Sequence, residues 1–123
     1  RLTRELIRPW VEDFDVMLTP TSAILTPPPG VVLDEQDNPE RGQPTLRGLA
    51  AFTGWVNVAG LPAISLPTHL DSRGAPLGVQ LIGGPFTESL LLQLGERLEQ
   101  QYRWYERRPA LTGEDRKDKD GHH

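Results

Sequence analysis

The 123-residue chain contains no cysteine, which excludes disulfide bonds, thiolate nucleophiles and cysteine-ligated metal sites. No apolar run approaches the ~20 residues that a membrane-spanning helix requires, so we expect no membrane partner. The formal charge is −4 and the arginines form no basic stripe, which argues against a nucleic-acid partner. Cysteine-free proteins occur both inside and outside the cell. We expect this chain to be cytoplasmic.

Residues that could act as a nucleophile or a base are scarce. The chain has two lysines, Lys117 and Lys119, both in a charged terminal segment, and four serines. Ser65, His69 and Asp71 are the one Ser-His-Asp cluster, but four steps of extended strand at ~3.3 Å each separate Ser65 from His69 by about 13 Å. A nucleophile and its base must approach to about 3 Å, so we interpret His69 as a structural residue beside a turn.

Neither a metal site nor a cofactor is expected. His122 and His123 lie in the charged terminal segment, where no geometry is preorganised for a metal. The acidic residues between 34 and 40 lack the Gly and Glu that an EF-hand needs at its sixth and twelfth positions. Residues 83–85 lack the Lys and Ser/Thr that follow in a phosphate-binding loop.

Helical spacing of apolar residues predicts three helical regions. Residues 1–14 form an amphipathic pattern, in which Pro9 either kinks the helix or begins a second one. Residues 46–58 are predicted to be a helix or a pair of turns, because two glycines interrupt the pattern. Residues 88–102 are the best-defined helix. Residues 21–45 show no periodicity and are expected to be a long loop.

Three short strands are also expected. Residues 15–19 are an apolar run ended by a proline. Residues 63–70 and 77–82 flank a segment rich in turn residues, which predicts an antiparallel hairpin. Pro67 within the first hairpin strand indicates an edge position or a bulge.

Four motifs in a fixed order are the most specific feature of the chain. Residues 14–21 read FDVMLTPT, residues 52–67 read FTGWVNVAGLPAISLP, residues 74–83 read GAPLGVQLIG, and a leucine-rich helix follows. Together they closely resemble the C-terminal part of the amidase signature family. This resemblance implies an α/β fold, the C-terminal portion of a mixed-sheet domain, with short strands and a hairpin flanked by helices. Residues 1–111 would form this portion, and residues 112–123 a charged, flexible tail.

The resemblance implies hydrolysis of a carboxamide C–N bond. In the family a serine attacks, a second serine on a cis peptide relays the proton to a buried lysine, and backbone amides stabilise the oxyanion. These residues lie upstream of the matched part, and both lysines of this chain are in its terminal segment. We therefore expect a fragment with no catalytic residue of its own, inactive alone, that supplies scaffold and a wall of the substrate pocket. The lack of a capping residue before Leu2 also favours a fragment.

The same resemblance suggests which residues border the substrate. The predicted substrate-binding residues are Thr21, Phe52 and Trp55. The alternative is that the motifs containing these residues have a purely structural role. Ala50 stands where related tRNA amidotransferases carry an aspartate for the α-amino group of glutamine, which favours a general amidase over a glutaminase.

The expected partners are a small-molecule amide and the N-terminal part of the same amidase, and a homodimer is left open. The alternative function is a stand-alone, non-catalytic binding or assembly module with an amidase-like C-terminal fold.

Overall fold

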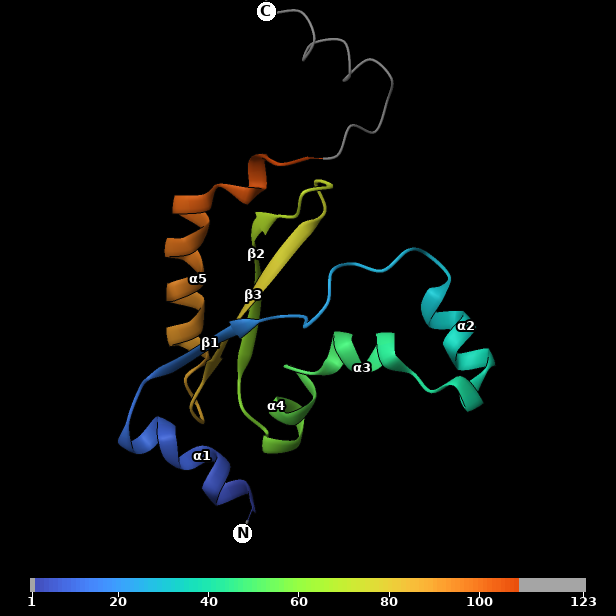
Figure 1. The fold of residues 1–123 in the computed structure, drawn as a ribbon. Coiled ribbons are helices and arrows are strands. Elements are labelled where there is room, and N and C mark those ends of the chain that lie inside the picture. The colour runs from blue at the N-terminus through green and yellow to red at the C-terminus, as the bar shows by residue number, and fades with distance from the viewer. Residues whose placement is uncertain (1, 109–123) are drawn as a thin grey trace, which may run out of the picture.

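A three-stranded antiparallel sheet with helices on both faces forms the centre of the computed structural model, which describes residues 2–108 (Figure 1). The elements along the chain are α1 (Leu2–Glu12), β1 (Val16–Pro20), α2 (Val31–Asp37), the 3-10 turn η1 (Pro39–Arg41), α3 (Pro44–Ala50), α4 (Gly54–Ala59), β2 (Ala63–Leu70), β3 (Pro76–Gly83), α5 (Glu88–Tyr102) and the 3-10 turn η2 (Trp104–Glu106).

The strand order is β1-β3-β2, and both pairings are antiparallel. The predicted hairpin is therefore confirmed, and the first strand pairs with its second arm. The expectation for Pro67 is also confirmed: β2 lies at one edge of this sheet, and its register with β3 shifts between Leu66 and His69. A proline lacks the N–H that a regular ladder needs, so the irregularity at this position has a direct cause.

Alternation along β3 divides the core between the two faces. Ile82 is fully buried with Val56 and Ala59 of α4, and α1 packs against this cluster. Leu81, its neighbour, points the other way and is buried with Leu66 of β2 and Leu91 of α5. Successive strand residues face opposite sides of a sheet, so β3 contributes buried side chains to both clusters.

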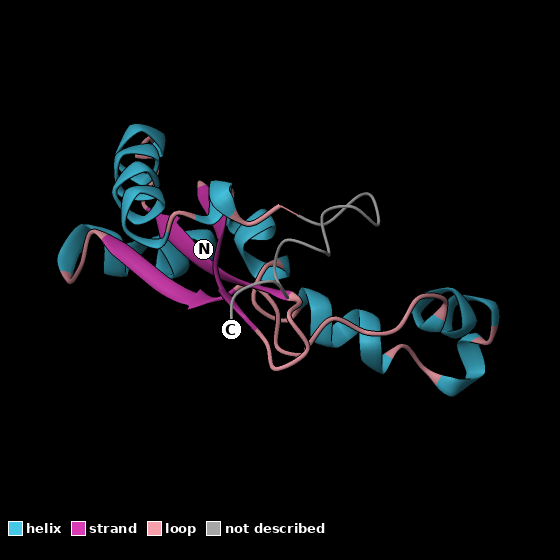
Figure 2. Cartoon of the chain, turned by 90° about the horizontal axis from the view of Figure 1, so that it is seen from above, coloured by secondary structure: helices cyan, strands magenta, loops and turns pink. Residues whose placement is uncertain are grey.

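The segment of residues 21–45 differs from the expected long loop. It contains α2, η1 and the start of α3, and α2 lies away from the sheet in both views (Figure 1, Figure 2). Helical turns begin at Pro39 and Pro44, where a missing N–H costs nothing. The carboxylate of Glu35 accepts hydrogen bonds from the backbone N–H groups of Thr45 and Leu46, which ties α2 to the first turn of α3. These contacts are made across ten or eleven residues, so local periodicity did not reveal them.

Two of the other helical predictions are refined by the structure. Residues 46–58, predicted as a helix or a pair of turns, belong to two short helices, α3 and α4, and residues 51–53 make the turn between them. Pro9 lies inside α1, which is assigned as one helix. No helix among residues 2–108 is long and apolar enough to cross a membrane. The predicted tail, residues 112–123, with its two histidines, lies outside the described residues.

Candidate functional site

A row of three polar side chains crosses the middle of the sheet. Thr19 of β1 and Ser65 of β2 are both register partners of Gln80 of β3, so the three side chains stand on the same face. We call Thr19, Gln80 and Ser65 the polar row. Gln80 is only 4% exposed. Its Nε2 donates to Thr19 Oγ1 at 3.0 Å and to the backbone carbonyl of Phe52 at 3.0 Å.

Thr21, one of the predicted substrate-binding residues, contacts Ser65 at the end of the polar row. Its Oγ1 lies 2.6 Å from Ser65 Oγ, and its backbone N–H donates to the carbonyl of Gly78 at 3.0 Å. A Cβ at Gly78 would lie 2.7 Å from Thr21 Oγ1 and 3.0 Å from Ser65 Oγ. The missing side chain at Gly78 therefore makes room for the pair of hydroxyl groups.

The other two predicted residues lie on either side of the start of α4. Phe52 is half-buried in the turn before α4, and its carbonyl is the one held by Gln80. Trp55 is half-buried and packs against the cluster that contains Ile82, with its ring 6.1 Å from that of Trp10 between centroids. The structure thus connects Thr21 and Phe52 through the polar row, and it places Trp55 in the packing between α4 and α1.

A pocket of about 320 Å³ lies between α4 and the sheet, beside the polar row. Thr53, Asn57, Ser65 and Gln80 contribute its polar side chains. These groups can donate and accept hydrogen bonds, but none of the residues lining the pocket titrates near neutral pH. The pocket can therefore orient a polar neutral molecule, such as an amide, without itself transferring a proton.

None of these four polar residues was predicted as a site residue. Thr53, Asn57, Ser65 and Gln80 all lie within the motifs at 52–67 and 74–83. The available signal was a glutamine in the middle of an otherwise apolar strand, since a buried polar side chain requires a hydrogen-bond partner.

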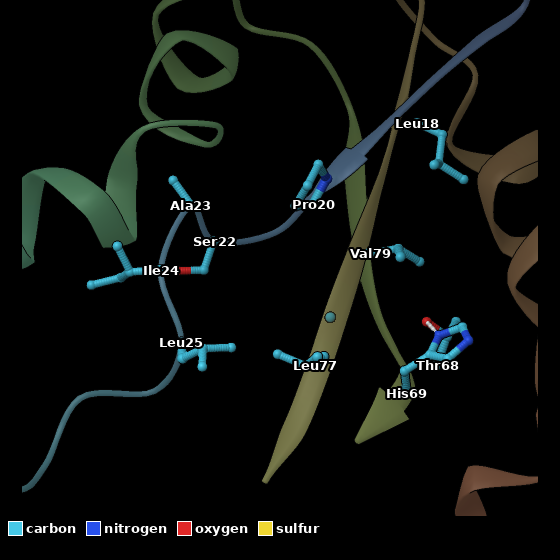
Figure 3. A pocket seen from close by; sticks show the side chains of 11 residues that line it. Leu18, Pro20, Ser22, Ala23, Ile24, Leu25, Thr68, His69, Leu77 and Val79 are labelled. Carbon is cyan, nitrogen blue, oxygen red and sulfur yellow. Dashed lines mark hydrogen bonds between the residues drawn. The ribbon is translucent and has the colours of Figure 1, made fainter. Parts of the chain in front are cut away.

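A second pocket, of about 440 Å³, opens on the opposite face of the sheet and is mainly apolar (Figure 3). Leu18, which is 65% exposed, and Val79 contribute to its wall. Ser22 also lines it, and its Oγ is buried without a hydrogen-bond partner among the described residues. Few polar groups converge here, so this pocket is less suited to an amide than the one beside the polar row.

The structure also gives Ser65 and His69 separate partners. Ser65 Oγ lies against Thr21 Oγ1, whereas His69 Nδ1 is 2.9 Å from Thr68 Oγ1 and its ring packs on Tyr102 at 5.3 Å between centroids. This geometry fits the interpretation of His69 as a structural residue.

The hairpin turn holds a strongly bonded carboxylate. Asp71, whose side chain is 3% exposed, accepts hydrogen bonds from the backbone N–H groups of Arg73 and Ala75 and forms a 2.8 Å ion pair with the Arg73 guanidinium. The side-chain hydrogen bond from Arg73, followed by the backbone bonds, holds the pKa of Asp71 below its ordinary value. These bonds close the turn between β2 and β3.

Comparison with known proteins agrees with this architecture. A family model described as Amidase matches residues 1–92. The chain belongs to the amidase family. Among curated members, this amidase chain is 39% identical over 114 residues to the 6-aminohexanoate-cyclic-dimer hydrolase of Pseudomonas sp. (strain NK87), covering 88% of this chain and 23% of the relative. It is 41% identical over 101 residues to one component of the glutamyl-tRNA(Gln) amidotransferase of Thermodesulfovibrio yellowstonii, covering 81% of this chain and 19% of that component.

A solved structure supports the fold of the amidase chain. The 6-aminohexanoate cyclic dimer hydrolase complexed with substrate matches with a TM-score of 0.78 and 34% sequence identity, over 89% of this chain and 24% of the hydrolase. The expected α/β fold is thereby confirmed. The chain spans between about a fifth and a quarter of the length of these relatives.

Proposed function

We propose that this chain is the C-terminal part of an amidase that hydrolyses carboxamide C–N bonds, and that it supplies scaffold and a wall of the substrate pocket. The observation that carries this proposal is the structural match to a hydrolase of the same family, which covers 89% of this chain and 24% of the hydrolase. The nucleophilic serine, the second serine on a cis peptide and the lysine would be contributed by the part of the amidase that precedes Arg1. That part is the proposed macromolecular partner.

The chemistry beside the polar row supports a binding role rather than a catalytic one. The lining of the 320 Å³ pocket provides hydrogen-bond donors and acceptors but no acid or base for a proton transfer. Thr21 and Phe52, both connected to the row, are the proposed wall residues. Trp55 packs against the core, which favours the structural alternative for this residue.

The proposed substrate is a small neutral amide. Two of the relatives named above are, by their names, hydrolases of the 6-aminohexanoate cyclic dimer. The chain also resembles a component of a tRNA amidotransferase, but Ala50 offers no carboxylate to a substrate ammonium group. A general amidase is therefore proposed over a glutaminase. A cytoplasmic location and a homodimer stay predictions.

A chimeric enzyme tests the proposal. The full chain replaces the matched quarter of the Pseudomonas 6-aminohexanoate-cyclic-dimer hydrolase, and hydrolysis of the cyclic dimer and of simple amides is measured. We expect the chimera to be active, and both the chain alone and the hydrolase without its matched quarter to be inactive. Circular dichroism establishes that each protein is folded.

Two results would overturn the proposal. One is a folded chimera that hydrolyses no amide. The other is turnover of a simple amide by the chain alone that Ser65→Ala abolishes, because this would place the nucleophile within the chain. The mass of the native gene product addresses the stand-alone alternative: it should be about four times that of this chain under the proposal, and close to that of the chain for an independent module.

A further inference from the structure

We propose that Gln80 is a positioning residue for the substrate wall: it holds the turn at residues 51–53, and with it Phe52, against the central strand. This inference rests on the proposed function, because it assumes that Phe52 borders the substrate. It adds a residue that contributes through the placement of another side chain rather than through the reacting atoms.

The orientation of the Gln80 side chain is defined by two hydrogen bonds. A primary amide nitrogen carries two hydrogens, and Gln80 Nε2 directs one to Thr19 Oγ1 and one to the carbonyl oxygen of Phe52, both at 3.0 Å. Thr19 Oγ1 also lies 3.0 Å from the carbonyl of Pro20, to which it donates its own hydrogen. The lone pairs of the Thr19 hydroxyl are therefore left to accept from Gln80. The result is a directional chain from β3 to β1.

Burial makes these hydrogen bonds consequential. Gln80 is 4% exposed, and its neighbours Leu81 and Ile82 along β3 are buried apolar residues. A buried amide without partners is costly, and a hydrogen bond in a water-poor setting is stronger than one at the surface. Loss of either acceptor would therefore leave a buried N–H donor of Gln80 without a protein partner, which destabilises this arrangement.

Among the described residues, the hydrogen bond from Gln80 is the one that joins the turn at residues 51–53 to the sheet. It lies between two short helices, α3 and α4, of seven and six residues. Helices of this length are not stable by themselves. Within the described part of the chain, Gln80 is the residue that donates a hydrogen bond to the Phe52 carbonyl. Thr53 N–H and Val56 N–H bond only within the segment, to Ala50 and Thr53.

Gln80 and the turn also meet at the pocket beside the polar row. Gln80 lines this pocket together with Thr53, the residue that follows Phe52. A displacement of the turn would therefore change both the position of Phe52 and the shape of this pocket. We expect such a change to alter substrate binding while the catalytic groups, contributed from elsewhere in the amidase, keep their arrangement.

Hydrogen exchange on the full chain is the first test. Gln80→Met keeps the side chain length and removes both donors, and Gln80→Glu keeps the shape but has no N–H to donate at neutral pH. Both variants should raise the amide exchange rate of residues 51–53 by about tenfold, the scale set by loss of one buried hydrogen bond. Leu81→Val is the matched control, because it trims a buried side chain on the opposite face of the same strand. It should lower the urea midpoint without this local effect.

Kinetics of the active chimera is the second test. A residue that positions only the binding wall affects the ground state and the transition state alike, so Gln80→Met should raise KM severalfold with little change in kcat. The Leu81→Val chimera should keep the KM of the parent chimera. A role limited to general stability predicts equal effects for both variants.

The outcomes separate this inference from the proposed function. If the parent chimera is folded but inactive, the proposed function fails, and hydrogen exchange alone decides whether Gln80 holds the turn. If the parent chimera is active but Gln80→Met and Leu81→Val share one KM, or if Gln80→Met leaves the exchange of residues 51–53 unchanged, the positioning role is wrong and the proposed function stands.

Discussion

Replacing Trp55 with alanine separates the two roles considered for this residue, a pocket wall and a core contact. Trp55 is half-buried against the cluster of Val56 and Ile82, and its ring meets that of Trp10 at a centroid distance of 6.1 Å and an interplanar angle of 39°. Trp10 is held independently by its indole N–H, which donates to the Ile82 carbonyl at 3.0 Å. The substitution therefore removes one ring from the packing and leaves its neighbour in place.

The expected loss of stability follows from these contacts. Truncation of a fully buried tryptophan to alanine costs ~3–5 kcal/mol, and a half-buried side chain should lose about half of that. An aromatic pair at this separation contributes ~0.5–1.5 kcal/mol beyond its buried area. We therefore expect Trp55→Ala to lower the free energy of unfolding by about 2–4 kcal/mol. Trp55→Phe, which keeps an aromatic ring, should lose about 1 kcal/mol.

Urea unfolding followed by far-ultraviolet circular dichroism measures this loss without relying on the fluorescence of the residue that is removed. The active chimera then supplies the ratio of kcat/KM for two amides that differ in acyl size. The packing argument predicts a lower unfolding midpoint and an unchanged ratio. A stability loss below about 0.5 kcal/mol together with a changed ratio would refute it and place Trp55 in the substrate wall.

Two further predictions concern the hydroxyl pair and the hairpin turn. Gly78→Ala should destabilise the chain by about 1–3 kcal/mol, because the added Cβ would lie 2.7 Å from Thr21 Oγ1. Urea unfolding should show that Thr21→Ala recovers part of this loss in the double variant, and strict additivity would contradict the steric explanation. Hydrogen bonds from Arg73 lower the pKa of Asp71. The Asp71 carboxylate therefore stabilises the hairpin at pH values above the ordinary pKa of aspartate. This stabilisation is lost as the pH falls through the lowered pKa of Asp71. Asp71→Asn should therefore unfold at a lower urea concentration at neutral pH, and the gap should close on acidification; a gap independent of pH would rule out this linkage.

The hairpin and α5 were predictable because their determinants are local. The turn residues between β2 and β3, the proline that disturbs β2 and the leucine spacing of α5 all act within a few positions of the chain. The family was predictable for a related reason, since ordered motifs can be recognised without knowing which residues they contact. The segment containing α2 was missed because Glu35 stabilises the start of α3 across a gap of ten residues.

Most of the candidate site depends on contacts between distant segments. Thr21 and Phe52 were identified through the resemblance, but Gln80 was not, although it lies within a matched motif. An isolated glutamine in an apolar strand signals that a partner is needed, but it does not identify the partner. The acceptors are Thr19, 61 residues away, and Phe52, 28 residues away.

The sequence by itself determined the family, the hairpin and the main helix, and its small stock of lysines and serines pointed away from catalysis by this chain alone. Only the tertiary structure decided which side chains stand together. The pairing of β1 with β3 aligns Thr19 with Gln80, and the hairpin register aligns Ser65 with the same residue. The physical reason is the sequence separation of the interacting residues. Turns and helical spacing depend on residues that are near one another in the sequence, whereas strand register and helix docking depend on contacts between distant segments.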